Sequence, residues 1–591
     1  MHMARTKAEL ERLIQGAMGI IKADLIITGG KVVNVYSGEI LDGIEISVLD
    51  GRICYTGLSA EHARGEQTQI IDAKGKYVSP GFIDGHTHFG HYARPFEHLQ
   101  SFVARGTTAV VASCDEFSTV FGYRGLEVFL DEVERHSVRV YSLVSMVAPQ
   151  DPLLCDTATF SNDEIRKALS DPRVLGMGEI VSWLRLLQCD TELLERIEMA
   201  QQKGQIIHGH TAGARDQKLC AVAACGISSC HEPVRFEDAL ARLRLGYWTM
   251  LREGSLRQDL EATLRPLLQS GVSLQRLILV TDSTTPDDVA EFGHMDHVVR
   301  RAISLGLPPI QALQAVTLNP ALYSGLEQDI GGIAPGRCAD IVLLECLDDC
   351  LVTDVLIGGK RVAKDGISLV DAPPLEFPGD MLNSLRFKPT VIRDLFKIPA
   401  PFAASKIRVM SLINQTITAE RILDVDTGSG FVVANLNEDL LKVAIFDRQL
   451  GKIAFGFLQG FGARIGAVAL TTNLDENTLM VIGSDDGDMA LCANALIESG
   501  GGIAIAQNGA IVERLDFPFG GICSLDSWQK VGSGLRRIQN RLKEMGSSFD
   551  KPIFALNFLP FVTLPSLRIT ARGLVNAKER KIVSLFADEL A

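Results

Sequence analysis

A repeated alternation of short β-branched segments with helical segments constrains the fold of this chain more than any other feature. Segments such as TTAVVAS, VRVYSLVSM, RVLGMGEI, QIIHGHT and LILVTD are each the right length for one buried strand. Between them lie stretches with helical apolar spacing, such as NDEIRKALSD and DTELLERIEMAQQKG. A parallel sheet with connecting helices accommodates this order. The alternation runs from about residue 78 to residue 337 and predicts a TIM-like (β/α)8 barrel.

Histidines gather directly after the first segment of this region. The stretch FIDGHTHFGHYARPFEH contains His86, His88, His91 and His98, four of the twelve histidines in the chain. Side chains two residues apart lie on the same face of a strand, so His86 and His88 can bind one cation together. Reactive groups in a parallel barrel lie at the carboxyl ends of the strands, where this pair is expected.

Four later strands also end in imidazole or carboxylate groups. In chain order these groups are Glu179, His208 with His210, His231 with Glu232, and Asp282. Each alone has a structural explanation, because a histidine can be a buried hydrogen-bonded residue and an aspartate after a strand is a common helix cap. Independent structural roles would have to place all of them at successive strand ends by accident. The joint pattern therefore predicts a metal site.

The regions on either side of the barrel have the short alternation of β-strands. This pattern appears in ADLIITGGKVVNV and GIEISVLDGRICYTG and returns in GGIAPGRCADIVLLE and DVLIGGKRVAKDG. We therefore predict a composite β-sandwich domain from residues 1–77 and 338–390, with the barrel at 78–337 between its two parts. Strand and helix patterns beyond residue 400 predict an α+β domain at 400–591.

The composition restricts the partners of the protein. A net charge of −14 lacks the excess of Lys and Arg that nucleic acids or anionic membranes require. The chain has no apolar run long enough to span a bilayer and no signal-peptide pattern, and its twelve scattered cysteines fit a reducing compartment. We expect a cytoplasmic protein that acts on a small molecule, and a homodimer or higher homo-oligomer as the common default.

Several motifs together resemble one known family. In chain order they are ADLIITGGKVVNVYSGEIL, PGFIDGHTH, GTTAVVASCDE, GMGEI, GHT with CHEP, TDSTTPDDV, ALQAVTLNPALY and GGIAPGRCADIVLL, followed by GFLQGFGARIGAVAL and GSDDGDMA. This set resembles the bacterial adenine deaminase family of the amidohydrolase superfamily. The resemblance extends over nearly the whole chain, including a C-terminal domain that few other amidohydrolases possess.

The resemblance implies two divalent cations in the barrel. It places His86, His88 and Asp282 on the first cation and His210 and His231 on the second, with Glu179 bridging the two. Hydantoinase-like relatives bridge the two cations with a carboxylated lysine on the same strand instead of a glutamate. The segment RVLGMGEIVSW contains no lysine, which weakens the hydantoinase-like interpretation. The family implies Mn2+ or Fe2+, and the imidazole and carboxylate ligands also suit Zn2+.

The implied reaction is the hydrolytic deamination of adenine to hypoxanthine and ammonia in purine salvage. Asp282 is the expected proton carrier, and Glu232 and Glu116 are candidates for protonating or orienting the base, with a supporting contact to a ligand histidine as the alternative for Glu232. The candidate pocket residues are Phe89, Tyr92, Trp183, His208 and Ser283, of which the aromatic ones could instead pack against helices. For His91, His294 and Asp287 we favour surface positions over the pocket mouth.

The sequence departs from the family at several positions around the expected metal ligands. The departures are Phe89-Gly90-His91-Tyr92 for Ile-Glu-Ser-Ser, Ser113-Cys114-Asp115-Glu116 for Asp-Pro-His-Glu, His208 and Ser283 for aspartates, and Leu474-Asp475-Glu476-Asn477-Thr478 for His-Asp-Ser-His-Asn. The six ligand positions are retained. Three other hypotheses therefore stay open: a deaminase of another amino-substituted N-heterocycle, a cyclic amide hydrolase, and a metal-binding protein that has lost catalysis.

Overall fold

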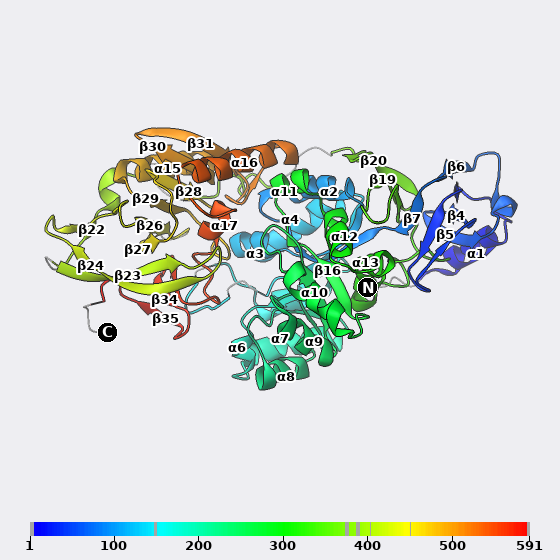
Figure 1. Cartoon of the computed structure of the whole chain (residues 1–591), viewed down its shortest axis with the longest axis horizontal. Helices are drawn as coiled ribbons and strands as arrows, with labels where there is room; N and C mark the ends of the chain where they lie inside the picture. Colours follow the sequence, from blue (N-terminus) through cyan, green and yellow to red (C-terminus); the bar gives the residue numbers. More distant parts are fainter. Residues whose placement is uncertain are drawn as a thin grey trace.

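The computed structural model describes residues 5–146, 150–155, 157–372, 377–385, 391–401, 404–448 and 451–587. Figure 1 shows three parts arranged in a row, with a barrel in the middle. Strands from before and after the barrel sequence lie at one end, and the C-terminal strands and helices lie at the other. Within the described ranges, no helix is both long and apolar enough to cross a membrane.

Parallel strands form the central barrel. They are β8 (Phe82–His88), β10 (Thr107–Ser113), β11 (Arg139–Val144), β12 (Val174–Ile180), β13 (Ile206–Gly209), β14 (Ser229–Cys230), β15 (Trp248–Arg252), β16 (Leu277–Val280) and β17 (Asp282–Ser283). The last two belong to one strand position, because β16 pairs with β15 whereas β17 pairs with β8. This position joins the two ends of the curled sheet, and the predicted TIM-like barrel is confirmed.

Helices cover the outside of the barrel because each has one apolar face. In α4 (Tyr123–Glu134), Leu126, Phe129, Leu130 and Val133 recur at helical spacing and are buried. The predicted helical segments form α5 (Asn162–Ala168) and α7 (Thr191–Gln202), which begin at side-chain caps. The others are α2 (Pro95–Val103), α3 (Asp115–Phe121), α6 (Trp183–Leu186), α8 (Asp216–Ala224), α9 (Phe236–Arg244), α10 (Leu260–Ser270), α11 (Pro286–Glu291), α12 (Met295–Ser304), α13 (Pro309–Ala315) and α14 (Leu318–Ser324).

Two sheets lie beside the barrel, and the seven-stranded one combines strands from both sides of the barrel sequence. In that sheet, β7 (Tyr77–Pro80) pairs with β2 (Lys31–Asn34) on one edge and with β18 (Ile341–Leu344) on the other. The chain therefore returns to its first sheet after the barrel, as the sequence predicted. The other elements of this part are α1 (Lys7–Ala17), β1 (Leu25–Thr28), β3 (Glu39–Leu41), β4 (Glu45–Leu49), β5 (Arg52–Gly57), β6 (Gln69–Asp72), β19 (Val352–Ile357), β20 (Lys360–Lys364) and β21 (Ile367–Ser368).

The C-terminal region, residues 391–587, is built on an eight-stranded sheet in the order β24-β23-β27-β26-β29-β28-β30-β31. Its strands are β23 (Ala404–Leu412), β24 (Thr418–Asp426), β26 (Leu440–Phe446), β27 (Ile453–Gln459), β28 (Ala467–Leu470), β29 (Met480–Gly483), β30 (Gly502–Gln507) and β31 (Ala510–Asp516). Alternate residues face opposite sides: Val443 packs with α16 (Trp528–Glu544), and Ala444 packs with α15 (Asp486–Ser499). Helices on both faces of a sheet make this an α+β unit, as predicted.

Shorter elements complete the C-terminal region and connect it to the barrel. They are β22 (Ile398–Pro399), β25 (Phe431–Val432), β32 (Cys523–Ser524), α17 (Pro552–Asn557), β33 (Leu567–Thr570), β34 (Gly573–Asn576) and β35 (Lys581–Val583). Strand β32 pairs with β9 (Tyr92–Ala93), which follows the first barrel strand. Helix α16 packs on α11, which follows the last barrel strand. The C-terminal region therefore covers the carboxyl ends of the barrel strands, the end where the predicted ligands lie.

The sheet topology supports the three predicted domains, but their exact limits stay a prediction. Several residues at or near the ends of these domains lie outside the described residues, namely 1–4, 373–376, 386–390 and 588–591.

Candidate metal centre

The six predicted ligands form three overlapping clusters at the carboxyl ends of the barrel strands. In each cluster, one ligand atom from every residue lies within 4.8 Å of the others. The clusters are His86 with His231 and Asp282, His86 with His88 and Glu179, and Glu179 with His210 and His231. Residues from five strand positions, far apart in the sequence, therefore converge on one small volume. The donor atoms are imidazole nitrogens and carboxylate oxygens, which suit divalent first-row metals.

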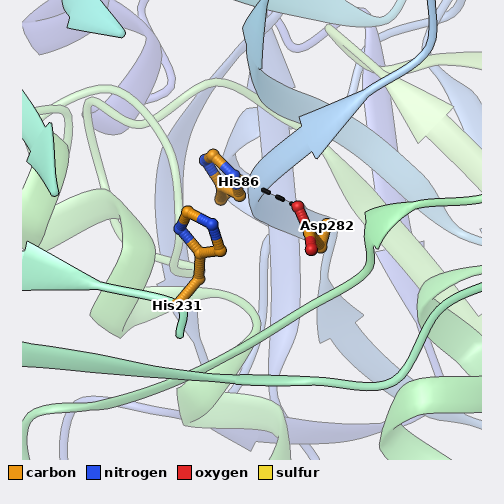
Figure 2. Close-up of side chains that lie close together, drawn as sticks. All are labelled: His86, His231 and Asp282. Carbon is orange, nitrogen blue, oxygen red and sulfur yellow. Dashed lines mark ion pairs between the residues drawn. The ribbon is translucent and has the colours of Figure 1, made fainter. Parts of the chain in front are cut away.

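His86 presents one ring nitrogen to this volume. Figure 2 shows the ring facing Asp282, and Nε2 lies 3.4 Å from Oδ1 of that residue. The ring also stacks on His231, with centroids 3.9 Å apart. The opposite nitrogen, Nδ1, lies 3.1 Å from Nδ1 of His208. In the described part of the chain Nε2 is buried and has no hydrogen-bond partner, as expected for a metal ligand, and burial lowers the pKa of His86 to about 4.

Glu179 lies between the two histidine pairs. Its Oε1 is 3.4 Å from Nε2 of His88, and its Oε2 is 2.6 Å from Nδ1 of His210 and 3.2 Å from Nε2 of His231. One carboxylate thus faces ligands of both predicted cations, which is the arrangement of a bridging residue. Burial opposes a charge on His231, but the carboxylates of Glu179 and Asp282 outweigh burial and raise the pKa of His231 to about 10.

Asp282 owes its position to the way the last strand closes the barrel. Its φ of 65° is in the left-handed region, at the start of β17 and directly after the break that separates β16 from β17. The preceding residue, Thr281, donates to Asp84 on the first strand from its hydroxyl at 2.5 Å and from its amide at 3.2 Å. The same Asp84 carboxyl accepts the amide of His86 at 3.4 Å. A single buried carboxyl therefore fixes His86 and Asp282 relative to each other.

Arg252, at the end of β15, is a site residue that the sequence search for metal ligands missed. It is 2% exposed, and its guanidinium pairs with Glu232, with Oδ2 of Asp282 at 3.1 Å and with Oδ2 of Asp259 at 2.8 Å. It compensates for the burial of three carboxylates at once. The sequence pattern that could have identified Arg252 is WTMLREGS, in which a charged residue ends a mostly apolar strand.

Asp115 is a second residue that the search missed. It begins α3, and its Oδ2 lies 3.2 Å from Nδ1 of His88, whose other nitrogen faces Glu179. A carboxylate on the far nitrogen of a ligand histidine fixes the tautomer and the orientation of the ring. The sequence marked position 115 only as a departure from the family pattern.

A cavity of about 120 Å3 opens beside these groups. Its wall includes Glu116 and Glu232 from the barrel, and Asp475, Asn477 and Phe554 from the C-terminal region. Burial raises the pKa of Glu116 to about 7, so a large share of its carboxyl groups carries a proton at neutral pH. Sequence reasoning did not foresee that a distant part of the chain forms one wall.

The predicted pocket residues separate into two groups. Tyr92 and Ser283 line the cavity, and the hydroxyl of Tyr92 accepts a hydrogen bond from Nδ2 of Asn557 at 2.8 Å. The structure places the other three away from the lining. Phe89 packs among Phe102 and Phe129 in the barrel core, Trp183 packs against that core from α6, and His208 lies behind His86.

The expectation of surface positions for three further residues is wrong. His91, Asp287 and His294 are 8%, 4% and 1% exposed. The C-terminal region covers the first two, because Nε2 of His91 contacts Oδ1 of Asn477 at 2.6 Å and Asp287 pairs with Lys551 at 3.6 Å. His294 stacks on Phe102 beneath the barrel helices.

Two family models match the chain. The model described as the amidohydrolase family matches residues 158–362, and the model described as the adenine deaminase C-terminal domain matches residues 415–581.

Similar proteins match over almost the full length. The adenine deaminase of Cenarchaeum symbiosum (strain A) is 38% identical, with 98% of this chain and 95% of that protein covered. Those of Moorella thermoacetica and Clostridium botulinum (strain Langeland) are 37% and 33% identical and cover 98% and 97% of this chain, and 99% and 97% of their own length. With the barrel, the clustered ligands and the C-terminal region, this similarity shows that the chain belongs to the adenine deaminase family of the amidohydrolases.

Proposed function

We propose that this protein is a binuclear metal-dependent aminohydrolase that converts adenine and water to hypoxanthine and ammonia. The observation that carries the proposal is the convergence of six predicted ligand side chains, with a shared carboxylate, beside a small cavity that all of them except His86 line. The relatives named adenine deaminase support the choice of substrate. A cavity of about 120 Å3 also suits a free base better than a larger nucleoside, because drug-sized ligands need roughly 300–1,000 Å3.

In this proposal His86, His88 and Asp282 would hold one cation, His210 and His231 would hold the other, and Glu179 would be shared between them. When bound, two such cations lower the pKa of water and thereby provide a nucleophile at neutral pH. Nε2 of His86 is buried and makes no hydrogen bond within the described ranges, and Glu179 contacts histidines on both sides; both observations support this assignment. We propose Mn2+ or Fe2+ as the native metal, with Zn2+ as the competing candidate.

Asp282 is proposed to move the proton of the reaction. Arg252 contacts its Oδ2, which leaves Oδ1 on the side of the ligand histidines. This oxygen takes a proton from the attacking water as the new C6–O bond forms. It then gives the proton to the amino nitrogen as the C6–N6 bond breaks and ammonia leaves. General acid–base transfer of this kind contributes roughly 10²–10⁴-fold in rate.

The two other candidate acids have different surroundings and therefore different proposed roles. Glu116 has a buried oxygen without a partner among the described residues and a pKa near neutrality, so it can donate a proton to a ring nitrogen of the base. Glu232 is held by Arg252 and lies 3.3 Å from Nε2 of His231. It remains a carboxylate that orients His231 and the amino group of the substrate.

The proposal is tested by measuring ammonia release from adenine, adenosine and other amino-heterocycles with manganese-loaded protein, together with metal analysis. We expect about two metals per chain and turnover of adenine. Asp282→Asn should lower kcat by at least about 100-fold, whereas Asp131→Asn, at an exposed residue of α4, should not change it. Turnover of another heterocycle alone, ring opening without ammonia, or equal activity of Asp282→Asn and wild type would each contradict the proposal.

We also propose a cytoplasmic location, a homodimer or higher homo-oligomer, and no nucleic-acid or membrane partner. The net charge of −14 supports the exclusion of nucleic acid, and symmetric assembly is the common state of such enzymes. Light scattering of the purified protein measures the assembly directly.

A further inference from the structure

The loop Leu474–Thr478 carries the C-terminal region into the cavity of the metal centre. It connects β28 to β29, and its residues Leu474, Asp475 and Asn477 line the cavity wall. Hydrogen bonds hold the loop against the barrel. The side chain of Asn477 accepts from Nε2 of His91 at 2.6 Å and donates to the hydroxyl of Thr119 at 2.7 Å. This loop is therefore part of a built wall.

The C-terminal region also fixes the loop from behind. The amide of Leu474 donates to the carbonyl of Asn557 at 2.9 Å, and the guanidinium of Arg448 donates to the carbonyl of Asn477. Asp475 has a φ of 74°, in the left-handed region that costs most residues about 1 kcal/mol or more. The structure around the loop holds this conformation, which directs the side chain to the cavity.

Asp475 has an unused carboxyl oxygen in the cavity wall. Its Oδ2 is buried and, within the described ranges, lacks a hydrogen-bond partner. Burial raises the pKa of Asp475 well above its usual value, and the charges of Asp115 and Glu179 add to this effect. A buried polar atom without a partner is costly, and such atoms in native proteins call for a ligand or another explanation.

The chemistry of the surroundings indicates which ligand atom this oxygen would contact. Phe554 and Phe558 provide an apolar wall that suits the face of a planar base. A base in contact with such a wall presents its nitrogen-bearing edge to the polar groups of the cavity. A carboxyl group matches that edge, because it accepts from a ring N–H when ionised and donates to a ring nitrogen when protonated.

We propose that Asp475 contacts a ring nitrogen of the bound purine, so that the C-terminal region helps to determine the substrate specificity of the barrel. This inference rests on the proposed function. It assigns to the C-terminal region a direct contact with substrate, in addition to covering the metal centre.

The test compares Asp475→Gly with wild type in the metal-loaded full-length protein. Glycine suits a φ of 74° and removes the carboxyl group, whereas Asp475→Asn keeps the shape and one acceptor. Glu476→Gln is the matched control, because Glu476 is in the same loop and a glutamine oxygen can still accept the amide of Ala571. We expect Asp475→Gly to raise KM for adenine at least about tenfold, Asp475→Asn to have a smaller effect, and Glu476→Gln to have none. Metal content should stay the same in all three.

Isosteric inhibitors separate a substrate contact from a structural role. Inhibition constants are measured for 1-, 3-, 7- and 9-deazaadenine, in each of which one ring nitrogen is replaced by carbon. If Asp475 contacts one of these nitrogens, the analogue that lacks that nitrogen should have the same inhibition constant in wild type and in Asp475→Gly. The inhibition constants of the other three analogues should rise about tenfold in Asp475→Gly, as in a double-mutant cycle. An equal loss for all four analogues, or no loss of adenine binding, would overturn the inference. Binding of adenine by wild type without ammonia release would instead refute the proposed function and leave the binding comparison intact.

Discussion

At the scale of single residues, two of the predicted ligand histidines have a neighbour in contact with their second ring nitrogen. His88 has Asp115 at 3.2 Å, and His86 has His208 at 3.1 Å. Such partners restrict the ring to the orientation that binding requires, so their loss weakens metal binding even though the ligand itself remains.

Asp115→Asn provides a test of this dependence. Asparagine keeps the shape but removes the charge that faces Nδ1 of His88. We expect metal affinity to fall about 10–100-fold, measured by competition with a chromophoric chelator, while Asp131→Asn should leave it unchanged. An unchanged affinity in Asp115→Asn would show that His88 needs no such support.

The buried histidine His136 makes stability depend on pH far from the metal centre. Burial lowers its pKa to about 3, and its Nδ1 accepts the amide of Val138 at 3.0 Å. Since the folded pKa lies below the unfolded value of about 6.5, the unfolded chain binds the proton first. The contribution to stability is complete above pH 6.5 and is lost towards pH 3, at about 1.4 kcal/mol per pH unit.

His136→Asn should remove this component, because an asparagine oxygen can accept the same amide without titrating. Urea unfolding of wild type and His136→Asn is compared between pH 7 and pH 5. We expect the free energy of unfolding of wild type to decrease more steeply, whereas the exposed control His62→Asn should follow wild type. Parallel curves for wild type and His136→Asn would be evidence against a buried neutral His136.

The residues found from the sequence differ in kind from those that it missed. The predicted ligands end strands that the barrel brings together, so local pattern and fold class indicated where they lie, and the family resemblance selected these six among the strand-end groups. Arg252, Asp115 and Asp475 act through contacts between segments far apart in the chain. Phe89 illustrates the opposite error, because it follows a ligand but its side chain turns into the core.

At the scale of elements, the barrel strands were predictable but the break in the last one was not. LILVTD reads as one strand, whereas the structure has β16 and β17 with Thr281 between them. At the break, the amide and the hydroxyl of Thr281 both donate to Asp84, on a strand nearly two hundred positions earlier. A tertiary contact of this kind has no signal in a local sequence pattern.

Helix α16 approaches α11 closely because position 532 is a glycine. A Cβ atom there would lie 2.9 Å from the carbonyl carbon of Pro286 and 3.0 Å from the amide nitrogen of Asp287. Gly532→Ala should therefore destabilise the protein by about 1–3 kcal/mol through overpacking, although alanine has the higher helix propensity. Thermal unfolding measures the effect, with exposed Ser533→Ala as the control. A stabilised Gly532→Ala would mean that the two helices separate without cost.

At the scale of the whole molecule, the C-terminal region contributes Phe519, Ile522 and Cys523 to the apolar core of the barrel. Phe519, from the C-terminal region, packs against Phe117 and Phe121 of α3, with ring centroids 5.0 and 5.4 Å apart, and is fully buried. The sequence predicted separate domains because the strand and helix patterns differ from one part of the chain to the next. These patterns contain no information on which faces of the domains pack together.

Phe519→Ala should destabilise both parts together. We expect a loss of about 3–5 kcal/mol and one common transition when unfolding is followed by calorimetry and by activity. Phe292→Ala, at a residue that is 44% exposed, should have little effect. Two separate transitions in Phe519→Ala, with the barrel unaffected, would show that the regions fold independently.

The pairing of β9 with β32 has a consequence for how such enzymes diversify. Tyr92, the first residue of β9, comes only four positions after the predicted ligand His88, and its backbone pairs with Cys523. Recombination that exchanges the C-terminal region between relatives therefore places a foreign strand beside the segment that follows the predicted ligand His88. Chimaeras should retain metal only when the segment around residue 92 is inherited together with its partner strand.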